Sequence, residues 1–192
     1  MRKSILIFLT VLAGSSHLGL SQVQVANPCP AAPATKLEAF DTNIASVVIK
    51  ASAEVGSLSL NTGVVSVRCR EITDANSGRK EQGISMEIAQ TGQPRDRLLI
   101  DYDEIPSLLN AIDYLNKLDF SVTPLNAFDA TFTTKGGLRI AAIGAQRTSA
   151  IYFSVRDART NLASVMFSRD EVSRFKALIE QAKTKLDSLS GR

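Results

Sequence analysis

The chain has 192 residues, of which 44% are hydrophobic and 21% are charged, and its formal net charge is +3. This length suits one domain that can bury a substantial core. The small charge excess argues against bulk electrostatic attraction to nucleic acid or to anionic lipid.

The first 21 residues have the order of a secretory signal peptide. A basic head at residues 1–3 precedes an apolar run at residues 5–13, and small residues at 13–15 or 19–21 offer cleavage sites. A membrane helix needs about 20 apolar residues, and neither this run nor any later stretch approaches that length. We therefore expect an exported protein, periplasmic or extracellular, with no membrane span after cleavage. An uncleaved N-terminal anchor is the alternative.

Cleavage after Ser21 changes the chemistry of the chain. It removes Arg2 and Lys3, so that Lys+Arg falls from 22 to 20 against 19 Asp+Glu and the formal net charge falls from +3 to +1. It also removes His17, the only histidine. A histidine-based catalytic triad and an imidazole metal site are then excluded. We expect no cofactor, and the near-neutral charge argues against nucleic acid as a partner.

Residues 22–36 form a Pro- and Ala-rich segment, which we expect to be an extended lead before a single α+β domain at residues 37–192. The lead holds Cys29, while Cys69 falls on the apolar side of a predicted strand. Export into an oxidising compartment permits a Cys29–Cys69 disulfide. A lone buried thiol at Cys69 is the other interpretation.

Alternating apolar and polar residues predict half-buried strands in the first half of this domain. The blocks lie at residues 47–55, 65–70, 84–88 and 98–100. The period then changes to that of a helix, with an apolar stripe from Ile105 to Leu118 and Pro106 in the first turn.

The second half repeats this order. Strands are predicted at residues 128–133, 138–140, 151–156 and 163–167, followed by a helix with an apolar stripe from Val172 to Leu189. Ser168 and Glu171 have capping-box spacing at the start of that helix, and residues 99–105 match 166–172 in pattern. The sequence thus predicts two ββββα units at residues 44–118 and 119–190. Together they make an α+β fold of antiparallel sheets with two helices packed on one face.

Helices that cover one face of an antiparallel sheet leave the other face partly exposed to water. By the strand alternation, that face carries five candidate ligand-binding residues: Arg68, Arg70, Arg139, Tyr152 and Arg156. Arginines beside an aromatic ring suit an anionic or single-stranded ligand. A solvated outer face with edge-protecting charges is the alternative interpretation.

The layout of paired ββββα units over residues 44–190 resembles that of the Whirly and purine-rich-element-binding proteins. The resemblance implies a sheet surface that grips single-stranded nucleic acid. The Whirly-type Lys-Gly-Lys-Ala segment is absent from this sequence, and export and near-neutral charge argue against nucleic acid. We therefore carry over the layout and not the ligand.

Three carboxylates, those of Asp101, Asp103 and Glu104, lie close together before the first predicted helix. They offer oxygen ligands for a hard cation such as Ca²⁺. Acidic residues at a helix start also cap N–H groups and complement the helix dipole, with Asp103 as the expected N-cap. The recurrence of Asp170 and Glu171 at the second junction favours capping.

The sequence predicts an exported, non-catalytic protein that binds a partner protein or polymer through its polar sheet face. A metal-dependent or hydrolytic enzyme built on Asp101, Asp103 and Glu104 is one alternative. A self-associating structural component of the cell envelope is another. The sequence gives neither the oligomeric state nor the identity of the ligand.

Overall fold

The computed structural model of the chain describes residues 32–42 and 45–190. The predicted signal peptide at 1–21, residues 22–31 of the predicted lead, and Cys29 lie outside the described residues. Within the described part, no helix is long and apolar enough to cross a membrane.

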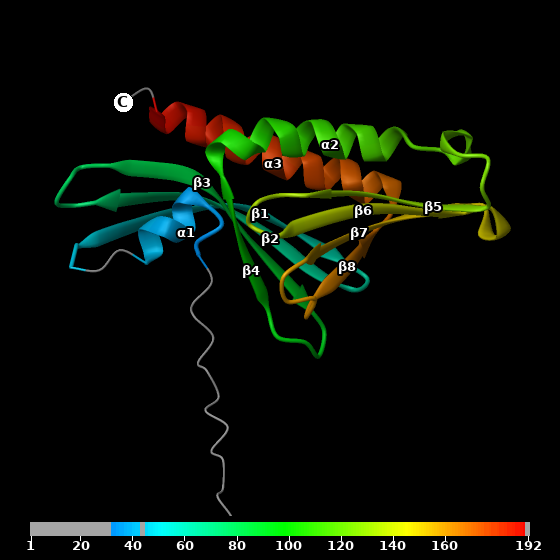
Figure 1. The fold of residues 1–192 in the computed structure, drawn as a ribbon, viewed down its shortest axis with the longest axis horizontal. Helices are drawn as coiled ribbons and strands as arrows, with labels where there is room; N and C mark the ends of the chain where they lie inside the picture. Colours follow the sequence, from blue (N-terminus) through cyan, green and yellow to red (C-terminus); the bar gives the residue numbers. More distant parts are fainter. Residues whose placement is uncertain (1–31, 43–44, 191–192) are drawn as a thin grey trace, which may run out of the picture. The chain divides into compact units, whose positions relative to one another are not determined.

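The described strands form two four-stranded antiparallel sheets, and the strands of each follow one another in sequence order (Figure 1). The first sheet contains β1 (Val48–Leu60), β2 (Gly63–Asp74), β3 (Lys80–Gln90) and β4 (Asp96–Asp101). The second contains β5 (Ala127–Thr133), β6 (Leu138–Ala145), β7 (Ala150–Asp157) and β8 (Ser164–Phe167). The described helices are α1 (Lys36–Asp41), α2 (Ile105–Lys117) and α3 (Arg169–Ser190), with 3₁₀ turns η1 (Tyr102–Glu104), η2 (Phe120–Val122) and η3 (Gln146–Thr148). The predicted α+β fold with repeated ββββα units is confirmed.

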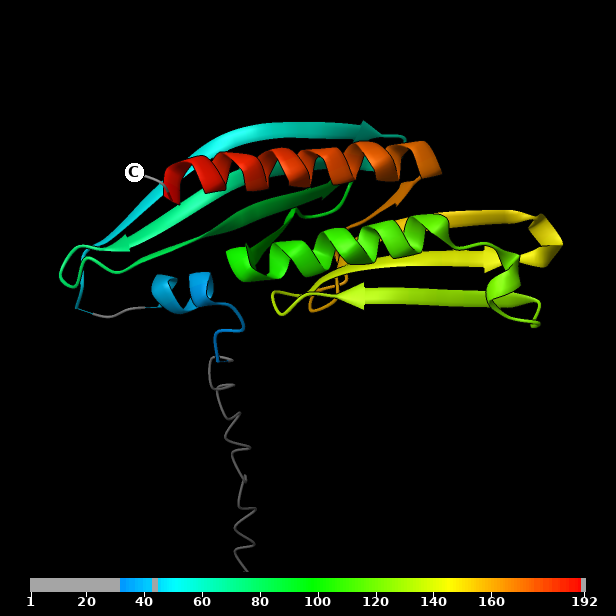
Figure 2. The same ribbon diagram turned by 90° about the horizontal axis from the view of Figure 1, so that it is seen from above.

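The helices α2 and α3 lie side by side and cover the inner faces of the sheets (Figure 2). In β2, the alternation places Val65, Val67 and Cys69 against α3, where at most 2% of each residue is exposed. One hydrophobic cluster joins these residues to the inner faces of both sheets and to the apolar stripes of both helices. Burial of this cluster explains why the period-two and helical patterns could be read from the sequence.

The start of α3 forms the predicted capping box. The Ser168 N–H donates to Glu171 Oε2 at 2.7 Å, and the Glu171 N–H donates to Ser168 Oγ at 3.3 Å. This reciprocal pair satisfies N–H groups at the helix start. The start of α2 differs, because its N-cap residue is Glu104, whose side chain makes no capping hydrogen bond, and the expected cap by Asp103 does not form.

A third helix, α1, adds to the predicted arrangement because it packs on the outer face of the first sheet. Its Leu37 and Phe40 are buried in a small cluster with Ile72 of β2 and Leu99 of β4. Ile72 has the same strand parity as Arg68 and Arg70, so this cluster lies on the face away from α3. Thr35 caps the helix by accepting a hydrogen bond from the Glu38 N–H.

Candidate anion-binding site

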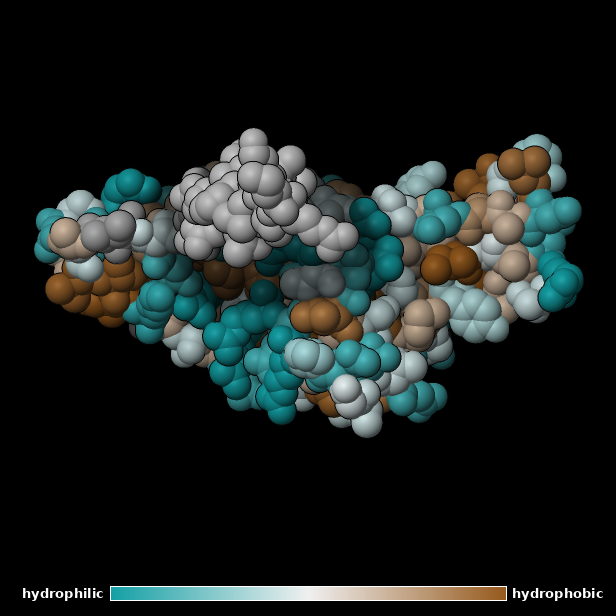
Figure 3. All heavy atoms as spheres, turned by 60° about the horizontal axis from the view of Figure 1, so that its bottom comes forward, coloured by the Kyte–Doolittle hydropathy of each residue, from teal (hydrophilic) through white to brown (hydrophobic). Residues whose placement is uncertain are grey.

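The outer face of the first sheet carries a hollow of about 260 Å³ beside α1. Figure 3 views this side, opposite α2 and α3, and shows mostly hydrophilic side chains in its middle, with smaller hydrophobic groups among them and further hydrophobic groups toward both ends. Two of the five predicted ligand-binding residues, Arg68 and Arg70, line the hollow. The full lining consists of Ser52, Ser66, Arg68, Arg70, Ser85, Glu87, Arg95 and Arg97.

Strand pairing brings these side chains together from neighbouring strands. Arg70 of β2 lies opposite Ser52 of β1, and Arg68 lies opposite Ser85 of β3. Cross-strand partners on one face have Cβ atoms about 4.5–5.5 Å apart, so each serine hydroxyl lies near an arginine stem. Because serine side chains are short and arginine side chains are long, the surface is hollowed between them.

The hollow is locally positive, since four arginines and one glutamate line it. Glu87 forms ion pairs with Arg95 at 2.8 Å and with Arg97 at 3.7 Å, and both arginine side chains are well exposed. Exposed pairs of this kind contribute about 0–1 kcal/mol each. Arg95 and Arg97 can therefore exchange Glu87 for the oxygen atoms of an anionic ligand at little cost.

Arg70 is an arginine of the hollow with a buried donor that lacks a partner among the described residues. Its side chain is 15% exposed, and its Nε is buried without a hydrogen-bond partner among the described residues. Its Nη2 lies 3.8 Å from Asp41 Oδ2, which is an ion-pair distance and too long for a hydrogen bond. A buried N–H donor without an acceptor is destabilising, and a ligand oxygen would satisfy it.

The other three predicted ligand-binding residues lie on the outer face of the second sheet. Arg139 of β6 and Arg156 of β7 are cross-strand partners, and Tyr152 of β7 lies opposite Ile143 of β6. The Arg139 Nε donates to Thr133 Oγ1 at 3.3 Å. The structure therefore divides the five predicted residues into two groups, one on each sheet.

Sequence reasoning missed Arg95 and Arg97, which line the hollow from β4 and the turn before it. The alternation that places Leu98 and Ile100 on the inner face also places Arg97 on the outer face. That signal was present in the sequence, but the register that sets Arg97 opposite Glu87 is a tertiary property.

The three carboxylates considered as cation ligands have separate partners. The two oxygens of Asp101 accept hydrogen bonds from the backbone N–H groups of Lys36 and Leu37, at 2.8 and 3.1 Å. Asp103 pairs with the Lys36 ammonium at 3.0 Å, which lowers the pKa of its carboxyl group. Glu104 accepts from the Lys135 N–H at 2.8 Å. Among the described residues, no group of three His, Cys, Asp or Glu side chains is placed to hold a metal ion.

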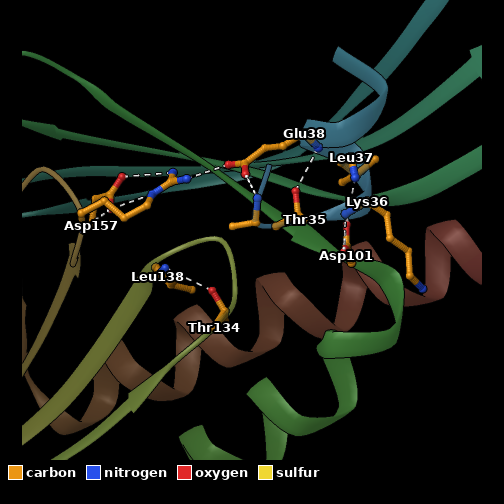
Figure 4. Close-up of polar contacts among 10 residues, drawn as sticks. Thr35, Lys36, Leu37, Glu38, Asp101, Thr134, Leu138 and Asp157 are labelled. Atoms are coloured by element: carbon orange, nitrogen blue, oxygen red, sulfur yellow. Dashed lines mark hydrogen bonds and ion pairs between the residues drawn. The ribbon is translucent and has the colours of Figure 1, made fainter. Parts of the chain in front are cut away.

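Asp101 therefore caps α1, which is distant in the sequence, and does not cap the nearby α2. Figure 4 shows Asp101 beneath the start of α1, below Lys36 and Leu37, with Thr35 and Glu38 on one side of it. Glu38 also accepts from Arg159 Nη1 at 2.7 Å, and Arg159 in turn pairs with the buried Asp157. The beginning of α1 is thus held at a fixed position beside the hollow.

Cys69 lies under α3, where its Sγ donates to the Ala182 carbonyl oxygen at 3.4 Å. Burial raises the pKa of this thiol, which disfavours the reactive thiolate. The predicted bond to Cys29 falls outside the described residues, so it stays a prediction.

No family model and no curated protein matches the sequence. Among solved structures, the chain matches the crystal structure of WHY1 from Arabidopsis thaliana with 11% sequence identity. The match covers 69% of this chain and 84% of that chain, and its TM-score is 0.32. At this level the match carries no argument about the ligand of the present chain.

One expectation about partners is corrected here. WHY1 is a nucleic-acid-binding protein, which mildly conflicts with the expectation that nucleic acid is an unlikely partner. That expectation rested on the predicted export and on the near-neutral net charge of the whole chain. Four arginines gathered in one hollow make the local charge density independent of the near-neutral total.

Proposed function

We propose that the chain is an exported, non-catalytic binding protein whose hollow on the first sheet holds an oxyanion of a partner protein or polymer. The observation that carries the proposal is Arg70, a mostly buried guanidinium with an unpartnered Nε beside serine hydroxyls. Guanidinium groups bind carboxylate, sulfate and phosphate through charge-assisted, often bidentate hydrogen bonds. The hollow offers hydrogen-bond donors and positive charge, which are the groups that bind an oxyanion.

The exported location is part of the same proposal. It is supported by the signal-peptide order of residues 1–21, which lie outside the described residues. The alternative enzyme built on Asp101, Asp103 and Glu104 is not favoured by the geometry, because each carboxylate has a separate protein partner.

The proposal is tested by titrating the ¹⁵N-labelled protein with sodium sulfate at constant ionic strength while recording the arginine Nε–H resonances. We expect saturable shifts at Arg70, Arg68, Arg95 and Arg97, since these line the hollow. Arg156, an arginine on the second sheet, is the internal control and should stay near its starting position. Equal, non-saturating shifts at all of these arginines would contradict the proposal.

The source of the oxyanion is distinguished by three labelled polymers measured by fluorescence anisotropy. Polyaspartate presents carboxylates, dextran sulfate presents sulfate esters, and single-stranded DNA presents phosphodiesters. Tight binding of one polymer and weak binding of the other two identifies the class of partner. Absence of binding to all three, together with no sulfate response, removes the proposed function.

A further inference from the structure

Besides Glu87 in its lining, the hollow has a second carboxylate of the chain close to Arg70, that of Asp41. Asp41 is the last residue of α1 and lies between two cations. Its Oδ1 is 2.8 Å from Lys50 Nζ, and its Oδ2 is 3.8 Å from Arg70 Nη2. Of the two contacts, only the one with Lys50 is short enough for a hydrogen bond.

The stability of α1 does not explain an acidic residue at this position. The C-terminal end of a helix carries partial negative charge, so a carboxylate there is unfavourable for the helix. Asp41 is therefore better explained by the cations that it faces across the sheet surface. Its placement is fixed, because Asp101 holds the start of α1 and because Leu37 and Phe40 are buried against the sheet.

We propose that Asp41 is an intramolecular competitor for the ligand of the hollow and lowers the affinity of Arg70 for an external oxyanion. This inference rests on the proposed function. An arriving oxyanion takes the Nε–H and the Nη2 of Arg70, and Asp41 keeps its shorter contact with Lys50. When the oxyanion replaces Asp41 at Arg70, Arg70 is paired with the ligand and Asp41 remains paired with Lys50. The ligand can therefore bind while α1 stays packed on the sheet.

The expected size of the effect follows from the exposure of the competing pair. Asp41 is 32% exposed, and a partly exposed ion pair at 3.8 Å is weak. Removing it should tighten binding at Arg70 by about two- to fivefold. Asp41 thus adjusts the affinity of the hollow and does not close it.

The test compares two variants with the same change of charge, Asp41→Asn and Asp103→Asn. Asp103 is the control because it is exposed, pairs with Lys36 and does not line the hollow. Sulfate affinity is read from the Arg70 Nε–H resonance of the full chain at constant ionic strength. We expect Asp41→Asn to bind sulfate about two- to fivefold more tightly than both the wild type and Asp103→Asn.

The outcomes separate this inference from the proposed function. Sulfate binding to the wild type with equal affinities in both variants overturns the role of Asp41 and leaves the hollow as a binding site. Sulfate binding that is detected only in Asp41→Asn supports the role of Asp41 as a competitor and shows that its effect on affinity is larger than fivefold. No binding at Arg70 in any of the three proteins overturns both proposals.

Discussion

The outer faces of the two sheets differ although the sheets share one topology. On the first, Arg68 and Arg70 meet two further arginines around short serine side chains, and α1 covers the adjoining surface. On the second, Arg139 and Arg156 lie on the same face as Tyr152, which is 52% exposed. A repeated strand order thus places arginines on both outer faces, but only the first face combines them with a mostly buried, under-satisfied guanidinium.

The two strand-to-helix junctions diverge in a similar way. At the second junction, Ser168 and Glu171 cap the helix that immediately follows them. At the first, Asp101 caps α1, from which it is separated by 65 positions in the chain. The junctions match in sequence pattern, yet the second caps the adjacent helix and the first caps a helix that is distant in the sequence. Function and stability therefore depend on side chains that the repeated layout does not specify.

The largest expected effect is the loss of the long-range cap. Asp101 is a buried residue, 2% exposed, and Asp101→Ala leaves the N–H groups of Lys36 and Leu37 without acceptors. Hydrogen bonds to a charged group contribute about 1.5–3 kcal/mol each, so the free energy of unfolding should fall by about 3 kcal/mol. Urea denaturation measures this change.

Asp103→Ala is the matched control for that measurement. Its ion pair with Lys36 is half exposed, so its loss should lower the free energy of unfolding by less than about 1 kcal/mol. Equal effects of the two alanine substitutions would show that Asp101 does not hold α1 in the manner described.

The local cap at the second junction should have a smaller, pH-dependent effect. Hydrogen bonds from the backbone and side chain of Ser168 lower the pKa of Glu171 below its ordinary value of 4.5. The ionised form is thus favoured by folding, so its contribution is complete above pH 4.5 and is lost as the pH falls through the lowered pKa. Ser168→Ala should cost about 1 kcal/mol at pH 7.

The pH dependence is measured by comparing urea denaturation of the wild type and Glu171→Gln at several pH values. The difference in stability between them should shrink as the pH falls below 4.5, because the wild-type carboxylate becomes protonated. A difference that is constant from pH 7 to pH 3 would contradict the assigned capping role.

Strands, the two long helices and the capping box were predictable because each depends on neighbouring residues in the sequence. The alternation around Val67 and the spacing from Ser168 to Glu171 are local signals. The position of α1 on the first sheet was not predictable, since Leu37 packs against strand residues that are distant in the sequence. Only two arginines of the hollow, Arg68 and Arg70, were predicted from the sequence. The register of β2, β3 and β4 brings Arg97 to the same hollow as Arg68, and strand register is a tertiary property.

The most direct test of the account compares mirrored double variants on the two sheets, Arg68→Ser/Arg70→Ser and Arg139→Ser/Arg156→Ser. Both remove two positive charges, so an effect of net charge alone would be the same in both. Anisotropy with whichever of labelled polyaspartate, dextran sulfate and single-stranded DNA the wild type binds most tightly should show at least about a tenfold loss of affinity for the first pair. The second pair should change affinity by less than about threefold. Equal losses in the two pairs, or a larger loss in the second, would contradict a binding site on the first sheet.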